Sequence, residues 1–126
     1  MEEKPLGYII EDYEDTLNVF TWALEMAGYN VEAAKDGAVA QKHLTEIIPD
    51  LIILDLHMPN VPGDKLLQQI HSDKRLVKTR VFIATADANM AAQLMDQAEL
   101  VLLKPISLSQ LRELAERFKP DAKSGS

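Results

Sequence analysis

The sequence predicts an α/β fold in which a doubly wound, five-stranded parallel sheet carries helices on both of its faces. Short apolar runs alternate five times with longer segments whose apolar residues recur at helical spacing. The third run, residues 51–54, is continuously apolar, which is typical of a strand covered on both faces. Strands that alternate with helices pair in parallel through right-handed crossovers, and this pairing gives a single open sheet.

The first strand is predicted at residues 7–10 and a weaker second strand at residues 30–34. The helix between them is expected to end at Gly28, and its buried side is formed by Leu17, Phe20, Leu24 and Ala27. Asp36 is a suitable N-cap for a second helix, which carries three apolar residues at helical spacing and is ended by Pro49. Those three residues are Ala40, Leu44 and Ile47.

The third strand runs directly into Asp55, and a turn that contains Pro62 and Gly63 leads into the third helix. That helix buries three apolar residues, Leu66, Leu67 and Ile70. The fourth strand is predicted at residues 81–84. A short fourth helix is predicted at residues 89–97 and the fifth strand at residues 100–103.

The last helix has the most complete set of local signals. Ser107 and Gln110 form a capping-box pair, and Ile106 and Leu111 are spaced as a hydrophobic staple. Its buried side would consist of Leu108, Leu111, Leu114, Ala115 and Phe118. We therefore predict one domain over residues 1–120. The polar residues 121–126 are predicted to be a disordered tail or a remnant of expression.

Composition restricts the classes of function. The chain has a net charge of −7, which disfavours direct binding of nucleic acid by this domain. It has no cysteine, so disulfides, thiolate zinc sites and cysteine nucleophiles are excluded. No apolar run approaches the roughly 20 residues that cross a bilayer, and the acidic start does not resemble a signal peptide. We expect a cytoplasmic protein without membrane contact.

Polar residues terminate four of the predicted strands. Glu11 and Asp12 follow the first strand, Asp55 the third, Thr85 the fourth and Lys104 the fifth. The carboxyl ends of parallel strands share one edge of a sheet, and ligands bind beyond that edge. We therefore expect three carboxylates, one hydroxyl and one ammonium group to converge there.

Three neighbouring carboxylates repel one another, and a divalent cation relieves this repulsion. A small set of oxygen ligands favours Mg²⁺ over Zn²⁺, and Mn²⁺ is an alternative. An aspartate with the ordinary pKa of about 3.9 is ionised at pH 7 and can act as a nucleophile without a general base. A phosphoryl group is a suitable electrophile, because the catalysis of its transfer consists mainly of positioning and charge stabilisation.

These residues lie in motifs that resemble those of the receiver domain of two-component response regulators. Asp55 stands in LIILDLHMPNVPG, Thr85 in FIATAD and Lys104 in LVLLKPIS, and the acidic pair Glu11-Asp12 follows the first strand. The resemblance extends from Gly7 to about Phe118. It implies a flavodoxin-like fold with the strand order 2-1-3-4-5.

By this resemblance Asp55 is the phosphoacceptor, and a sensor histidine kinase or a histidine phosphotransfer protein supplies the phosphoryl group. Autocatalytic phosphorylation and dephosphorylation at Asp55 are expected. Glu11 and Asp12 match the acidic pair that binds Mg²⁺ together with Asp55, and the backbone carbonyl of His57 matches a further metal ligand. An output domain, fused or separate, and a homodimer are compatible with the family.

The resemblance also implies roles for the remaining residues of the edge. Thr85 would donate its hydroxyl to a phosphoryl oxygen, and Lys104 would pair with Asp55 or its phosphate. The peptide bond before Pro105 would be cis. Side chains at the positions of His57, Ala86 and Asp87 are expected to modulate the lifetime of the phosphoryl group more than its uptake.

Two features depart from the family pattern. Val101 stands three residues before Lys104, at the switch position where relatives commonly have an aromatic residue. The interval of 19 residues from Thr85 to Lys104 (104 − 85) is also shorter than expected. A β-branched valine has few rotamers, so a conformational signal would pass through Thr85 and a shortened fourth helix instead.

Other interpretations remain open at this point. The chain could be a pseudo-receiver, an interaction module that keeps the site without being phosphorylated. A haloacid dehalogenase-type phosphatase is disfavoured, because such enzymes have a second acid where this chain has His57. Asp12 alone could be a helix N-cap and Asp55 a turn residue. Outside the motifs, we expect Trp22 to be packed, and His43 and His71 to lie at the surface or at helix ends.

Overall fold

A computed structural model describes residues 3–120 as five strands and five helices, joined with two short 3₁₀ turns. The strands are β1 (Leu6–Ile10), β2 (Asn30–Ala34), β3 (Leu51–Asp55), β4 (Arg80–Thr85) and β5 (Leu100–Leu103). The helices are α1 (Glu14–Met26), α2 (Gly37–His43), α3 (Gly63–Ser72), α4 (Ala88–Gln93) and α5 (Leu108–Arg117), and the 3₁₀ turns are η1 (Lys74–Leu76) and η2 (Met95–Gln97). Residues 121–126, for which a polar tail was predicted, lie outside the described residues.

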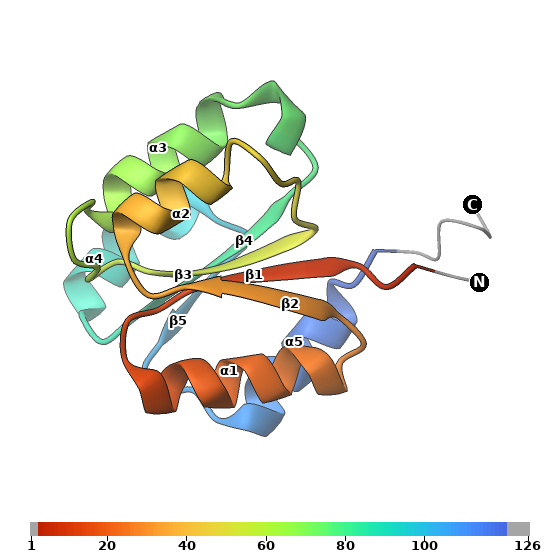
Figure 1. Cartoon of the computed structure of the whole chain (residues 1–126). Coiled ribbons are helices and arrows are strands. Elements are labelled where there is room, and N and C mark those ends of the chain that lie inside the picture. Colours follow the sequence, from red (N-terminus) through yellow and green to blue (C-terminus); the bar gives the residue numbers. More distant parts are fainter. Residues whose placement is uncertain (1–2, 121–126) are drawn as a thin grey trace.

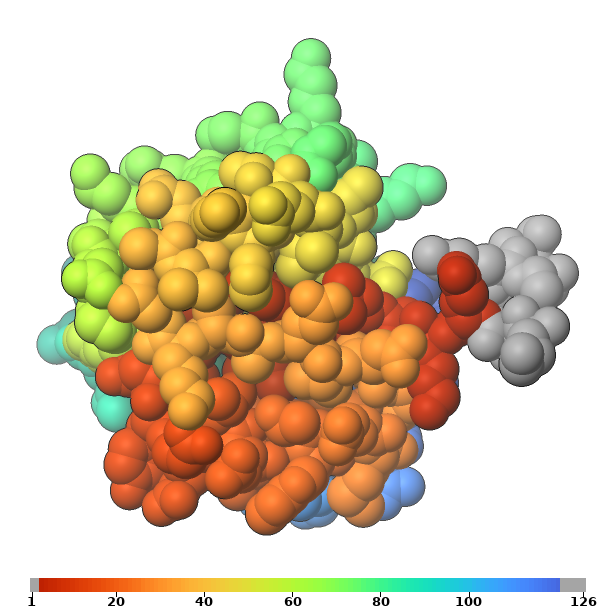
Figure 2. Space-filling view, in the orientation of Figure 1, coloured from red at the N-terminus to blue at the C-terminus, as the bar shows by residue number. Residues whose placement is uncertain are grey.

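All four strand pairings are parallel, and the order of the strands is β2-β1-β3-β4-β5. Helices α1 and α5 lie on one face of the sheet, and α2, α3 and α4 lie on the other (Figure 1). The exposed side chains of the edge strand β2 lie at the surface between α1 and α2 (Figure 2). The predicted doubly wound fold with the order 2-1-3-4-5 is therefore confirmed.

The central strand β3 explains why the sheet is covered on both faces. All five of its residues are buried. Ile52 and Leu54 pack with α2 and α3, whereas Leu51 and Ile53 pack with α1 and α5. Successive side chains of a strand point to opposite faces, so a continuously apolar strand requires a helical layer on each side.

Several of the predicted helix ends are found in the structure. The Asp36 carboxylate caps α2 by accepting hydrogen bonds from two backbone N–H groups, and the Ser107 hydroxyl caps α5 by accepting one from Gln110 N. Gly28 follows α1 with a φ of 99°, a conformation that glycine adopts without a steric penalty. The local polar chemistry of the sequence thus places these helices correctly.

Two helices are shorter than predicted. Helix α2 ends at His43 and does not continue to Pro49. The hydroxyl of Thr45 donates to the carbonyl of Lys42, a local bond that competes with further helical turns. Helix α4 ends at Gln93 and is followed by the 3₁₀ turn η2. No residue of α4 is buried, so little packing energy stabilises a longer helix.

The expectation that Trp22 is packed was wrong, because its side chain is 54% exposed. Phe20 occupies the inner side of α1, and a residue two positions later points about 200° away from it.

His43 lies at the end of α2, as expected, but its Nδ1 is also 2.9 Å from the hydroxyl of the buried Tyr8. None of the helices in residues 3–120 has the length and the apolar composition that a membrane span requires.

Phe20→Ala and Trp22→Ala form a matched pair that tests the orientation of α1. Phe20→Ala is expected to lower the free energy of unfolding by about 3–5 kcal/mol, because it leaves a cavity in the core. Trp22→Ala is expected to change it by less than about 1 kcal/mol, as is usual for surface positions. Urea unfolding followed by circular dichroism measures both, and equal losses would contradict this orientation.

Candidate functional site

The buried polar residues of the described chain gather at one edge of the sheet. Among residues 3–120 they are Glu11, Asp55 and Thr85, which are 1%, 5% and 0% exposed. Glu11 directly follows β1, and the other two are the last residues of β3 and β4. These three strands are neighbours in the sheet. Buried polar groups are costly unless they are paired, so their concentration at this edge marks it as the candidate site.

The sheet brings the three predicted carboxylates together. Oxygen atoms of Glu11, Asp12 and Asp55 all lie within 4.8 Å of one another. Asp12 is exposed, whereas the other two are buried, so the cluster faces solvent through Asp12. Carboxylate oxygens at this spacing are donors that Mg²⁺ or Mn²⁺ prefers, and the donor set therefore fits a hard divalent cation.

Lys104 is the cationic member of the site. Its Nζ lies 2.7 Å from Glu11 Oε1 and 3.4 Å from Asp55 Oδ2. The sequence had suggested Asp55 as its partner, but in the structure Glu11 is the closer one. The peptide bond between Lys104 and Pro105 is cis, the geometry that the resemblance implied.

The charges of the site are not balanced by Lys104 alone. The pKa of Glu11 is raised, first because burial disfavours its charged form and further because Asp55 repels it. The hydrogen bond from Lys104 lowers the same pKa without cancelling the effect of burial. A second positive charge at this edge would favour the ionised form of Glu11, as a bound divalent cation does.

Backbone N–H groups orient two of the carboxylates. His57 N donates to Asp55 Oδ1 over 3.0 Å, and Tyr13 N donates to Glu11 Oε2 over 3.2 Å. The other oxygen of each carboxylate faces Lys104. Sequence reasoning missed both donors, because a backbone N–H group leaves no signature in residue type. Asp12 does not cap a helix, since the residue before α1 is Tyr13. The alternative of Asp55 as a turn residue agrees with its local hydrogen bond from His57 N, two positions later.

Thr85 links the site to the fourth helix. Its Oγ1 accepts a hydrogen bond from Asp87 N over 3.1 Å, so its proton is available for donation to another oxygen. The carboxylate of Asp87 accepts hydrogen bonds from Asn89 N and Met90 N and thereby caps α4. Asp87 thus has a structural role as the cap of α4, and its role in modulating the phosphoryl lifetime stays a prediction. The other two predicted modulating residues, His57 and Ala86, are exposed.

The predicted switch residue lies away from these polar contacts. Val101 is paired in register with Ile83 of β4 and packs partly buried against the core on the α4 side of the sheet. Its side chain is therefore part of the packing beneath α4.

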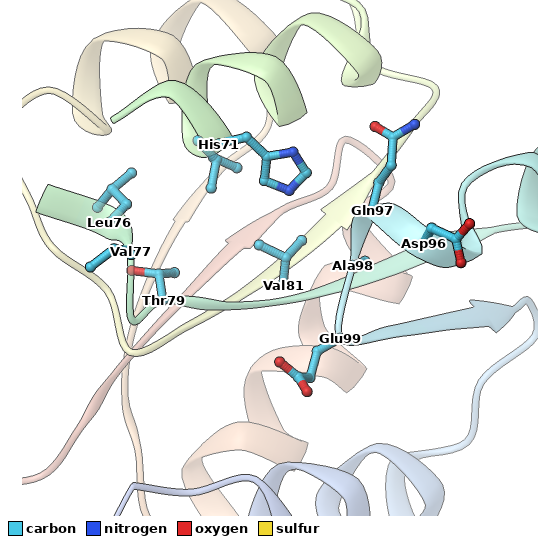
Figure 3. Close-up of a pocket in the computed structure, with 10 residues that line it drawn as sticks. His71, Leu76, Val77, Thr79, Val81, Asp96, Gln97, Ala98 and Glu99 are labelled. Atoms are coloured by element: carbon cyan, nitrogen blue, oxygen red, sulfur yellow. The ribbon is translucent and has the colours of Figure 1, made fainter. Parts of the chain in front are cut away.

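Two of the hollows in the described part of the chain lie at opposite ends of the strands. A mainly apolar hollow of about 400 Å³ lies beside Lys104 and is also lined by Val19, Phe20, Pro105 and Ile106. A second hollow, of about 390 Å³, lies at the amino ends of β4 and β5 (Figure 3). His71 and Glu99 line this second hollow (Figure 3), which contains none of the three carboxylates of the site. Of these two hollows, the first adjoins the candidate site through Lys104.

In the metal-free protein, the change in the free energy of unfolding caused by Glu11→Gln is expected to be more favourable at pH 8 than at pH 4. Glu11 has a raised folded-state pKa, so its stabilising contribution is present below its unfolded pKa and is lost as the pH rises through the folded one. The amide stays neutral at both pH values. Urea unfolding in the presence of a chelator measures the difference. If the variant and the wild type differ in their free energy of unfolding by the same amount at pH 4 and at pH 8, the pKa of Glu11 is not raised.

Comparisons with known proteins identify the family to which the chain belongs. Residues 8–116 match the family model described as the response regulator receiver domain. The chain is 38% identical over 82 residues to the DNA-binding dual master transcriptional regulator RpaA of Synechocystis sp., which covers 65% of this chain and 34% of that protein. It is 31% identical over 108 residues to the transcriptional regulatory protein PrrA of Mycobacterium leprae, which covers 85% of this chain and 46% of that protein. The chain thus spans less than half the length of these two relatives.

A solved structure shows the same fold over nearly the whole chain. The signal receiver domain of a Luxo repressor protein from Vibrio parahaemolyticus is 25% identical, with a TM-score of 0.81, over 92% of this chain and 90% of that one. The matched family model covers far more than half of the 126 residues. The protein therefore belongs to the response regulator receiver domain family of two-component signal transduction.

Proposed function

We propose that Asp55 accepts a phosphoryl group from a phosphohistidine on a sensor histidine kinase or a histidine phosphotransfer protein. The observation that carries this proposal is the buried Asp55 carboxylate, which has Lys104 on one oxygen and the His57 N–H group on the other. The Lys104 ammonium offsets the negative charge of Asp55, and the His57 N–H group fixes the orientation of the carboxylate. A carboxylate held in this way at the ligand-binding edge of the sheet is suited to nucleophilic attack.

The transfer would proceed in a single displacement. An oxygen of Asp55 forms a bond to phosphorus while the phosphorus–nitrogen bond of the donor breaks. The electron pair of that bond stays on the imidazole nitrogen of the donor, which takes up a proton. The product is an acyl phosphate on Asp55, and water later hydrolyses it to the carboxylate and inorganic phosphate. Thr85 and Lys104 would each contact a phosphoryl oxygen, Thr85 as a hydrogen-bond donor and Lys104 as a cation.

Glu11, Asp12, Asp55 and the carbonyl of His57 would hold the metal ion, Mg²⁺ or Mn²⁺. When bound, a divalent cation supplies positive charge to the phosphoryl oxygens. Two solved structures of this fold are the Mn²⁺-bound form of response regulator Rcp1 (19% identical, TM-score 0.75) and the phosphorylated cyanobacterial phytochrome response regulator RcpA (24% identical, TM-score 0.76). At these identities the likeness is one of fold, and the bound groups are properties of those two proteins.

The domain would act as a cytoplasmic relay between a kinase and an output. Residues 1–120 would form the receiver unit, and the output would be a fused domain or a separate protein. RpaA and PrrA are transcriptional regulators more than twice as long as their matched segments, which supports a fused output in those proteins. The apolar hollow beside Lys104 would offer the phosphodonor a contact next to Asp55.

Incubation with acetyl phosphate and Mg²⁺ is expected to add one phosphoryl group, about 80 Da, to the intact mass of the protein. The mass change reflects one acyl phosphate, formed on the carboxylate of Asp55. Asp55→Asn is the matched control, because it keeps the shape of the side chain and removes the nucleophile. The adduct should be lost in this control and in the presence of a chelator.

The pseudo-receiver is the competing function, and the same samples distinguish it. A wild-type protein that binds Mg²⁺ by calorimetry but forms no adduct would contradict phosphorylation and support a pure interaction module. An adduct that persists in Asp55→Asn would place the phosphoryl group on another residue.

Phosphorylation would reach α4 through the hydrogen bonds of Thr85 and Asp87. The Asp87 N–H group binds the Thr85 hydroxyl, and the Asp87 carboxylate caps α4. A Thr85 hydroxyl that turns toward a phosphoryl oxygen therefore alters the loop that holds this cap. The route does not require rotation of Val101, which is β-branched and partly packed in the core.

Beryllofluoride, a phosphoryl mimic, is expected to shift the backbone amide signals of Asn89 and Met90 in an NMR spectrum. Both amides donate to Asp87, so they report on the cap directly. Asp87→Asn is the matched variant, because asparagine keeps the capping ability and removes the charge. This variant should retain the shift, whereas its phosphoryl lifetime should differ from wild type. Amide signals that stay unchanged with the mimic would contradict this route.

A further inference from the structure

The loop between β3 and α3 is attached to the start of α2. Gly37 N donates to the carbonyl of Pro59 over 3.0 Å, and the side-chain amide of Asn60 donates to Asp36 Oδ2. In Figure 1 the start of α2 and this loop lie at the same side of the molecule, where the strands reach their carboxyl ends. Two hydrogen bonds from different residues therefore connect segments that lie more than 20 positions apart in the sequence.

Asp36 uses both of its carboxylate oxygens. Oδ1 accepts hydrogen bonds from Ala38 N over 2.6 Å and from Val39 N over 3.3 Å, which caps α2. Oδ2 accepts the hydrogen bond from Asn60. A serine would satisfy the cap with its single oxygen but would not supply the second acceptor. Capping alone therefore does not explain the choice of a side chain with two acceptor oxygens.

The backbones of the two segments are also in close contact. A Cβ atom on Gly37 would lie 2.5 Å from the carbonyl oxygen of Val61 and 2.9 Å from its nitrogen, so only glycine fits at this position. Asn60 has a φ of 72°, in the left-handed region that asparagine tolerates better than most residues. The loop thus has a defined conformation that depends on its contact with α2.

The same loop contributes two backbone groups of His57 to the candidate site. His57 N donates to Asp55 Oδ1, and the carbonyl of His57 is the expected backbone ligand. Pro59 and Asn60, which are attached to α2, follow His57 by two and three positions. Because the loop is short, its attachment restricts the direction of the His57 carbonyl.

We propose that Asp36 and Asn60 are positioning residues, which hold the β3–α3 loop in the conformation that binds a divalent cation. This inference rests on the proposed function, because the metal site belongs to it. It adds the requirement that the start of α2 holds the loop in place, although α2 contributes no metal ligand of its own. Each residue acts through the loop and touches neither the metal nor Asp55.

The test is the affinity for Mg²⁺, measured by isothermal titration calorimetry without any phosphodonor. Asp36→Ser keeps the cap and removes the second acceptor, and Asn60→Gly removes the donor and tolerates the left-handed conformation. Each is expected to raise the Kd about fivefold, which corresponds to the loss of one ordinary hydrogen bond. The double variant should be no weaker than either single variant, because both remove the same bond.

Asp36→Asn serves as the rescue variant. Its amide oxygen can cap α2, and its amide nitrogen can donate to Asn60 once the Asn60 amide has flipped. Wild-type affinity in this variant, with a weakened affinity in Asp36→Ser, is the expected pattern. A role in stability alone would change the midpoint of urea unfolding and leave the Kd of the folded protein unchanged.

The outcomes separate this inference from the proposed function. If all variants bind Mg²⁺ like wild type, or if the losses of the two single variants add, the positioning role is overturned while phosphorylation of Asp55 stands. If the variants weaken Mg²⁺ binding as expected but wild type forms no phosphoryl adduct, the positioning role stands and the proposed function fails. A wild-type protein that binds no Mg²⁺ overturns both.

Discussion

The repulsion among three carboxylates at one edge of the sheet is the constraint on which the site depends. Glu11, Asp12 and Asp55 lie within a few ångströms of one another, and Lys104 is the ammonium group that pairs with two of them. Burial of Glu11 further disfavours its charged form and raises its pKa. Such an arrangement is tolerated only where the surrounding fold holds it in place, and its oxygen ligands fit a divalent cation.

The fold holds this arrangement through its apolar layers and its backbone. Strand β3 is buried along its whole length, so the position of Asp55 is set by the packing of the residues before it. The N–H groups of Tyr13 and His57 orient two of the carboxylates, and the loop after Asp55 is attached to α2 through Asp36 and Asn60. Stability and function are therefore coupled in the same short segments that follow the strands.

Much of the fold could be predicted from the sequence, because apolar periodicity and helix caps are local signals. The strand ends at Asp55 and Thr85 are where the apolar runs predicted them, and this placement identified the candidate site. Properties that depend on tertiary packing could not be predicted. The exposure of Trp22 follows from which side of α1 meets the sheet, and the pairing of Lys104 with Glu11 follows from side-chain directions at the edge. The backbone donors of the site have no residue signature at all.

Reductive trapping tests the central claim most directly, because it identifies the phosphorylated residue. Borohydride reduces an acyl phosphate to an alcohol, so phosphorylated aspartate becomes homoserine and can be located by peptide mass mapping. After incubation with a phosphodonor and Mg²⁺, we predict homoserine at position 55 and unmodified Asp12. Homoserine at another position, or none in a protein that binds Mg²⁺, would contradict the assignment of Asp55 as the phosphoacceptor.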